Sequence, residues 1–134
     1  MHKYTVEFRI EGRILIPSDV TEALGLEPCQ VRRAVDIAEG KRQRNAMWAY
    51  DGGSGDAATK RDWDSLEEGL LFLHEQLSPK RAAIYLNFAR FDICWWCGHF
   101  QKSFDGGPTF SAQLFQKLAD FGAPLVLDNY FSRE

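Results

Sequence analysis

Residues 4–10 read Tyr-Thr-Val-Glu-Phe-Arg-Ile, and this stretch decides the fold. Its apolar side chains alternate with polar ones, which is the pattern of a β-strand with one buried side and one solvent-facing side. Gly12 follows and is expected to bend or end the strand. The stretch therefore predicts one strand of a sheet whose two faces differ in character.

Outward from this strand, the apolar spacing predicts three helices, over residues 18–24, 63–77 and 112–121. Ser18 and Ser111 are suitable N-caps, and Gly25 and Gly122 are suitable C-terminal glycines. The helix over 63–77 has the strongest apolar stripe, and Ser78-Pro79 is expected to stop it.

Four further strands are predicted, over residues 47–50, 82–88, 93–99 and 125–131. Residues 90–92 are predicted as a tight connection, so that 93–99 returns antiparallel to 82–88. The segment 28–45 is predicted as a partly ordered loop with one extended stretch, and 51–60 as a flexible connector rich in Gly and Ala.

This order of elements predicts a single α/β domain over residues 1–134, of the α+β class. We expect a two-layer sandwich, in which a mixed and mostly antiparallel sheet carries the helices on one face. A ferredoxin-like order of strands is the nearest familiar topology.

Composition narrows the class of protein. The chain has 134 residues, of which 45% are apolar, and a formal net charge of −3, which argues against nucleic acid as the main partner. The sequence shows neither a signal-peptide pattern nor an apolar run long enough to cross a membrane. Three cysteines are too few for a disulfide framework, so we expect a cytoplasmic protein with free thiols.

The segment Cys94-Trp-Trp-Cys97 is the one motif that suggests chemistry, as a redox dithiol or half of a zinc site with His99. No helix is predicted to follow it, and residues three apart on a strand point to opposite faces. Cys29 or His74 would have to supply a distant fourth zinc ligand. We therefore favour two buried structural thiols and expect no catalytic residue, metal or cofactor.

The stretch from Arg32 to Arg44 is basic and lies near Trp48, so it could bind RNA or phosphate by charge and stacking. Because the net charge of the chain is negative, a solvated loop is the favoured interpretation, although Arg33 could still contact an acidic partner. Trp95 and Trp96 must face opposite sides of their strand, so one of them faces the side that no helix need cover. That ring is either an interaction anchor or covered by the basic loop.

Several stretches of the chain together resemble a family of small bacterial proteins, domain of unknown function 4279. They are the first strand with Gly12, residues 17–28, Trp48, residues 110–125 and residues 128–130. The resemblance covers nearly the whole chain and is weakest over 29–60. It implies a stand-alone bacterial cytosolic protein, and no catalytic residue is implied because the family has no established activity.

The hypothesis we favour is a non-enzymatic module that binds a protein or itself, for example an immunity protein that binds a toxin. Its candidate contact residues are Arg33, Trp48, Trp95 and Trp96. One alternative is a small metal-binding or redox protein that uses Cys94, Cys97 and His99. A second alternative is nucleic-acid binding through the loop from Arg32 to Arg44.

Overall fold

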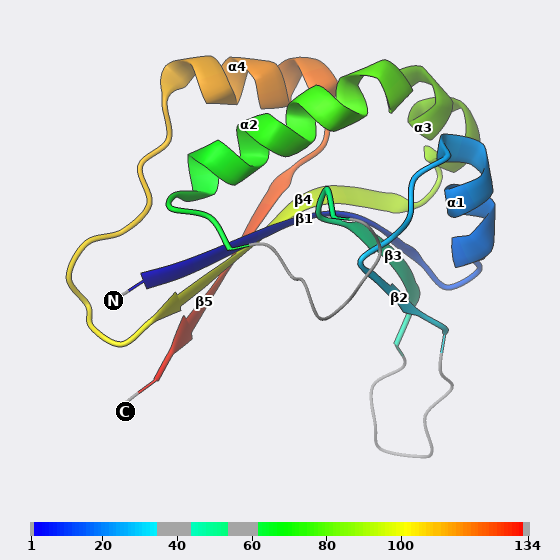
Figure 1. Ribbon diagram of the computed structural model, residues 1–134. Helices are drawn as coiled ribbons and strands as arrows, with labels where there is room; N and C mark the ends of the chain where they lie inside the picture. Colours follow the sequence, from blue (N-terminus) through cyan, green and yellow to red (C-terminus); the bar gives the residue numbers. More distant parts are fainter. Residues whose placement is uncertain (1, 35–43, 54–61, 133–134) are drawn as a thin grey trace.

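The computed structural model describes residues 2–34, 44–53 and 62–132, which form an α+β fold (Figure 1). In chain order the elements are β1 (His2–Gly12), α1 (Pro17–Leu24), β2 (Gln30–Arg32), β3 (Ala46–Tyr50), α2 (Leu66–Leu77), the 3-10 turn η2 (Ser78–Lys80), α3 (Arg81–Phe88), β4 (Asp92–Gln101), α4 (Ala112–Phe121) and β5 (Leu125–Phe131). The predicted loops over 28–45 and 51–60 lie partly outside the described residues.

The strands form one mixed sheet in the order β2-β3-β1-β4-β5. β1 pairs antiparallel with both β3 and β4, and β2 pairs antiparallel with β3. These four strands follow the predicted ferredoxin-like order. β5 is added parallel to β4 after the α4 crossover, which makes it an edge strand.

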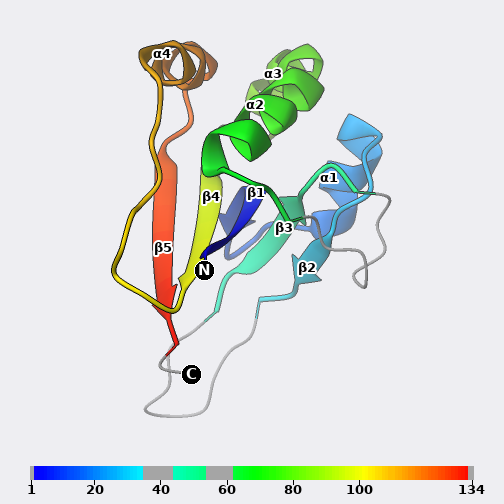
Figure 2. The same cartoon turned by 60° about the vertical axis from the view of Figure 1, so that its left-hand side comes forward.

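The helices lie on one side of the sheet, as the two-layer prediction requires (Figures 1 and 2). Val6, Phe8 and Ile10 of β1 face them and are at most 1% exposed. These side chains pack with the buried faces of the helices in one apolar core, which includes Leu70, Leu73, Ile84, Leu118 and Phe121. We call this side of the sheet the helix face and the opposite side the open face.

The prediction of a strand over 82–88 is wrong, since these residues belong to helix α3. Ile84 and Phe88 are buried four residues apart, whereas Leu86 between them is 85% exposed. A strand would have placed all three side chains on one face. The antiparallel partner of β4 is therefore β1, across the middle of the sheet.

Two of the three helix starts also differ from the sequence expectation. Ser111 caps α4 as predicted, because its hydroxyl accepts from the Leu114 amide at 3.1 Å. α1 instead begins at Pro17, one residue before the expected cap Ser18, and has no side-chain cap. α2 begins after Ser65, while Trp63 donates its amide to the Tyr4 carbonyl and extends the sheet. None of the described helices combines the length and apolar character needed to cross a membrane.

Candidate functional site

The two cysteines of the C-x-x-C segment lie on opposite faces of β4. Cys94 pairs with Arg9 and faces the open side, whereas Cys97 pairs with Val6 and faces the helices. Burial raises the pKa of Cys94 to about 11 and that of Cys97 to about 12. Within the described residues no group of three or more His, Cys, Asp or Glu could hold a metal ion. The prediction that the two sulfurs point to opposite faces of the strand is thus confirmed.

Trp48 and Trp95 are core residues, which corrects their assignment as partner contacts. Both rings are 0% exposed. The Trp48 indole donates to the Thr21 hydroxyl at 3.0 Å, and the Trp95 ring packs edge-on against Phe8 and Phe121. Neither ring is accessible to a partner.

Trp96 faces the open side, as expected for one of the two adjacent indoles, but it is only 7% exposed. The Arg9 guanidinium lies 4.0 Å from its ring centroid, and its Nε1 donates to Asp128 Oδ2 at 2.6 Å. Arg9 Nε in turn donates to Glu7 Oε1 at 2.8 Å. Charge and hydrogen bonds therefore hold the Trp96 ring flat against the sheet, and it is not an exposed anchor.

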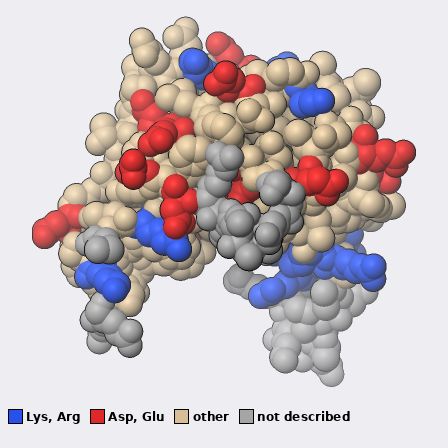
Figure 3. Space-filling view, viewed as in Figure 1, with Lys and Arg blue, Asp and Glu red and all other residues tan. Residues whose placement is uncertain are grey.

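Arg33 is exposed and is the one member of the predicted contact set that a partner could reach. It lines a groove of about 400 Å³ with Ile16 and Val31, between α1 and β2. Its neighbour Arg32 lies 3.8 Å from Glu11 and donates to the Asn45 carbonyl. In Figure 3 basic side chains gather in the region of β2, and much of the predicted basic loop lies outside the described residues.

No sequence pattern pointed to a surface of the described residues where several aromatic side chains are exposed together. It lies at and just beyond the C-terminal ends of β4 and β5, and we call it the aromatic edge: Phe100, Phe104, Tyr130 and Phe131. The Phe104, Tyr130 and Phe131 side chains are 83%, 45% and 43% exposed. The one available signal was the presence of aromatic residues at the end of the predicted strand 125–131 and directly after the predicted strand 93–99.

The aromatic rings of this surface are ordered in two stacked pairs. Phe100 and Tyr130 stack across β4 and β5 on the open face, with centroids 4.7 Å apart. Phe104 and Phe131 stack with centroids 4.4 Å apart and planes within 7°. Each exposed ring is thereby held in place by a neighbouring ring.

The backbone of β5 offers hydrogen-bonding groups beside these rings. The Trp95 amide donates to the Pro124 carbonyl, and the Ser132 amide donates to the Gln101 carbonyl. These two bonds use residues 124 and 132, and in a parallel ladder every second residue of a strand bonds to the same neighbour. The even-numbered residues of β5 therefore turn their backbone N–H and C=O groups toward β4. The odd-numbered residues, Leu125, Leu127, Asn129 and Phe131, turn theirs outward, and the sheet of the described residues ends there (Figure 2).

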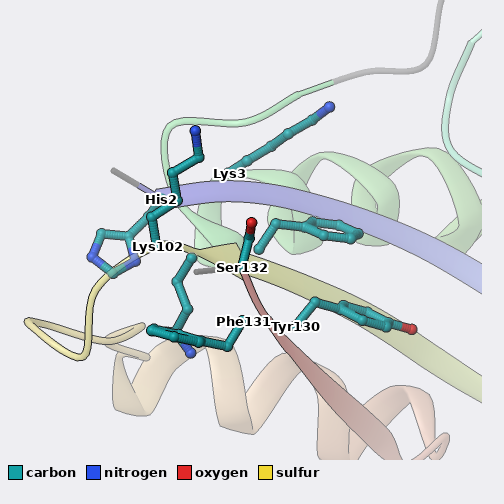
Figure 4. A pocket seen from close by; sticks show the side chains of 8 residues that line it. His2, Lys3, Lys102, Tyr130, Phe131 and Ser132 are labelled. Carbon is teal, nitrogen blue, oxygen red and sulfur yellow. The ribbon is translucent and has the colours of Figure 1, made fainter. Parts of the chain in front are cut away.

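A pocket of about 300 Å³ lies at the same end of the sheet (Figure 4). Its lining residues come from β1, the end of β4 and the end of β5: His2, Lys3, Phe100, Gln101, Lys102, Tyr130, Phe131 and Ser132. Three aromatic rings and two lysine side chains thus border one small cavity.

A chain of hydrogen bonds fixes the His2 wall of this pocket. His2 Nε2 lies 2.7 Å from the Asp105 carbonyl, which can only accept, so this nitrogen carries a hydrogen. His2 Nδ1 lies 2.8 Å from His99 Nε2. His99 is 2% exposed, stacks on Tyr4, and places Nδ1 3.1 Å from the Asn129 side-chain amide. His99 therefore supports the end of the sheet and lies on the face opposite Cys94.

Comparison with known proteins identifies a family. The family model described as Domain of unknown function (DUF4279) matches residues 2–132. No curated protein and no solved structure matches the chain.

Proposed function

The chain belongs to the DUF4279 family, and on that premise we propose that it is a non-enzymatic protein-binding module of the bacterial cytoplasm that uses the aromatic edge. The observation that carries this proposal is the exposure of Phe104, Tyr130 and Phe131 beside a strand edge. Aromatic residues dominate the energetics of protein interfaces, and monomeric proteins seldom leave such a group uncovered.

The occupant we propose is an extended segment of a different protein, added to β5 as a further strand. Exposed edges invite strand addition and are usually blunted by charges, Pro or bulges. β5 carries no Pro and a single charge, Asp128, and the residues whose backbone groups turn outward are Leu125, Leu127, Asn129 and Phe131. The backbone of the partner segment would bond to these residues.

The single charge of β5 favours a different protein over a second copy of this chain. Two β5 strands that paired antiparallel over their full length would bring Asp128 opposite Asp128 of the second copy. Like charges directly opposite each other on a sheet are destabilising. A basic residue opposite Asp128, flanked by apolar residues that contact Val126 and Tyr130, is the complementary pattern.

A toxin that this chain neutralises is the particular partner we propose. The net charge of −3 and the position of Asp128 in the middle of the edge strand both favour a basic partner. The support is this charge complementarity, and the interaction needs none of the chemistry of Cys94 and Cys97, whose thiols stay protonated at neutral pH.

A two-step binding experiment tests the proposal. Proteins captured by the tagged chain from its native cells are identified, and each candidate is then produced alone and titrated against the purified chain. We expect a 1:1 complex that the double variant Tyr130→Ser, Phe131→Ser weakens at least tenfold. Leu86→Ser is the matched control, because Leu86 is 85% exposed on α3.

Two outcomes would overturn the proposal. One is an equal loss of affinity in the Leu86→Ser variant and the double variant. The other is a purified chain that binds none of the captured candidates at low or physiological salt. A complex between two copies of this chain alone would replace the proposed partner with self-association.

A further inference from the structure

We propose that the pocket at the end of the sheet binds a small aromatic carboxylate, that is, a flat apolar ring that bears one carboxylate group. The basic residues Lys3 and Lys102 border the pocket, and no Asp or Glu is among its described lining residues. The chain as a whole carries more acidic than basic residues, so this local excess of positive charge runs against the net charge of −3.

The aromatic walls select a flat apolar group. Phe100, Tyr130 and Phe131 line the cavity, and the Phe100 and Tyr130 planes lie within 10° of each other. Aromatic rings prefer offset stacking or edge-to-face contact with other rings. The volume of about 300 Å³ is at the small end of the range for small-molecule sites, which suits one or two fused rings.

The two lysines supply the charge for the carboxylate. Among the described residues no carboxylate lies within ion-pair distance of Lys102, which is exposed. Lys3 lies 3.6 Å from Asp62, and both side chains are more than half exposed. Such a surface pair is weak, so Lys3 can turn to a ligand at little cost.

His2 shapes the pocket without supplying the charge. Both of its ring nitrogens already take part in hydrogen bonds, to the Asp105 carbonyl and to His99. The ring is therefore a fixed wall, and recognition of the carboxylate falls to Lys102 and to Lys3, whose side chain points away from Lys102 in Figure 4 and would turn on binding. A lysine ammonium binds such a group as a point charge, without the bidentate geometry of arginine.

Titration with 1-naphthoate, followed by NMR of the backbone amides, tests the proposal. The neutral analogue 1-naphthamide keeps the rings and removes the charge, and 1-naphthylmethylammonium reverses it. We expect saturable binding of naphthoate with shifts centred on residues 100–102 and 130–132, binding of the amide at least tenfold weaker, and no binding of the ammonium compound.

Matched variants locate the charge. Lys102→Gln is expected to weaken naphthoate at least fivefold, whereas Lys117→Gln, on the exposed side of α4, leaves the affinity within a factor of two. Equal binding of naphthoate and the amide, equal effects of the two lysine variants, or no saturation at millimolar naphthoate would overturn the proposal. Because Lys102→Gln leaves the exposed rings of the aromatic edge intact, a variant that loses naphthoate but keeps the protein partner separates this site from the proposed protein-binding function.

Discussion

The rings of Phe100 and Tyr130 stack face to face across β4 and β5, with centroids 4.7 Å apart and planes 10° apart. Tyr130 is nevertheless 45% exposed. Both residues line the pocket, and they lie where β5 forms the edge of the sheet of the described residues.

Loss of the exposed rings should leave the fold intact. We expect the double variant Tyr130→Ser, Phe131→Ser to lower the free energy of unfolding by no more than about 2 kcal/mol, since it removes two surface stacking contacts. Phe8→Ala removes a ring that is 0% exposed and should cost about 3–5 kcal/mol. Urea denaturation measures both. An edge variant as unstable as Phe8→Ala would mean that these rings serve the core.

Gly98 is required by the packing of the open face. A Cβ at this position would lie 2.7 Å from Thr5 Oγ1 and 2.7 Å from the Trp96 ring. Thr5 is 2% exposed and Trp96 is held by Arg9 and Asp128, so neither can move aside easily. We expect Gly98→Ala to destabilise the chain by about 1–3 kcal/mol in thermal unfolding.

The control for this substitution is Gly107→Ala. A Cβ at Gly107 would meet nothing within 4 Å, so the variant should unfold at the wild-type temperature or slightly above it. A Gly98→Ala variant with the same stability as Gly107→Ala would show that the open face tolerates the extra atom.

The thiols of Cys94 and Cys97 should be inert in the folded chain. A pKa of about 11 leaves about one Cys94 in a thousand as thiolate at pH 8, and Cys97 has a pKa of about 12 and is fully buried. We expect iodoacetamide to modify neither within an hour, and both rapidly in urea, as read by mass spectrometry. Fast native labelling of Cys94, or a Cys94–Cys97 disulfide under mild oxidant, would restore the redox alternative.

His74 should make the fold sensitive to mild acid. Burial lowers the pKa of His74 below 6.5, and the nearby Lys117 lowers it further. A lowered pKa in the folded state means that the unfolded chain binds the proton more tightly. Stability is therefore fully present above pH 6.5 and falls as the pH drops through the interval down to the folded-state pKa.

The difference between wild type and His74→Gln isolates this contribution from the other two histidines. We expect the gap in unfolding free energy between pH 7 and pH 5 to be smaller in the variant, as measured by urea denaturation. An identical gap in both proteins would show that His74 is not perturbed in the folded chain.

Sequence patterns correctly predicted the features that depend only on residues close together in the chain. The alternation in β1 and the cap at Ser111 depend only on neighbouring residues, and both were confirmed. The strand prediction for residues 82–88 was wrong because seven residues of mixed polarity fit a strand or a short helix equally well. In the structure the backbone is helical, and the exposure of Leu86 between buried Ile84 and Phe88 follows from the helical period.

The candidate site depends on long-range order, which explains why none of the residues of the aromatic edge was among the predicted contact residues. Whether β5 lies at an edge is decided by the sheet order, and no feature within residues 125–131 encodes it. The cover on Trp96 likewise comes from Arg9, which lies on β1 and is far away in the sequence. The adjacent indoles led to the prediction of Trp95 and Trp96 as contact residues, whereas the accessible aromatic rings lie at the strand ends.

Hydrogen exchange of the β5 amides in the partner complex tests strand addition most directly. The amides of Leu127 and Asn129 point outward from the ladder, whereas those of Asp128 and Tyr130 point toward β4. If the partner adds a strand, exchange at Leu127 and Asn129 slows at least tenfold on saturation, while Asp128 and Tyr130 are slow already in the free chain. Unchanged exchange at Leu127 and Asn129 in a saturated complex would contradict the account.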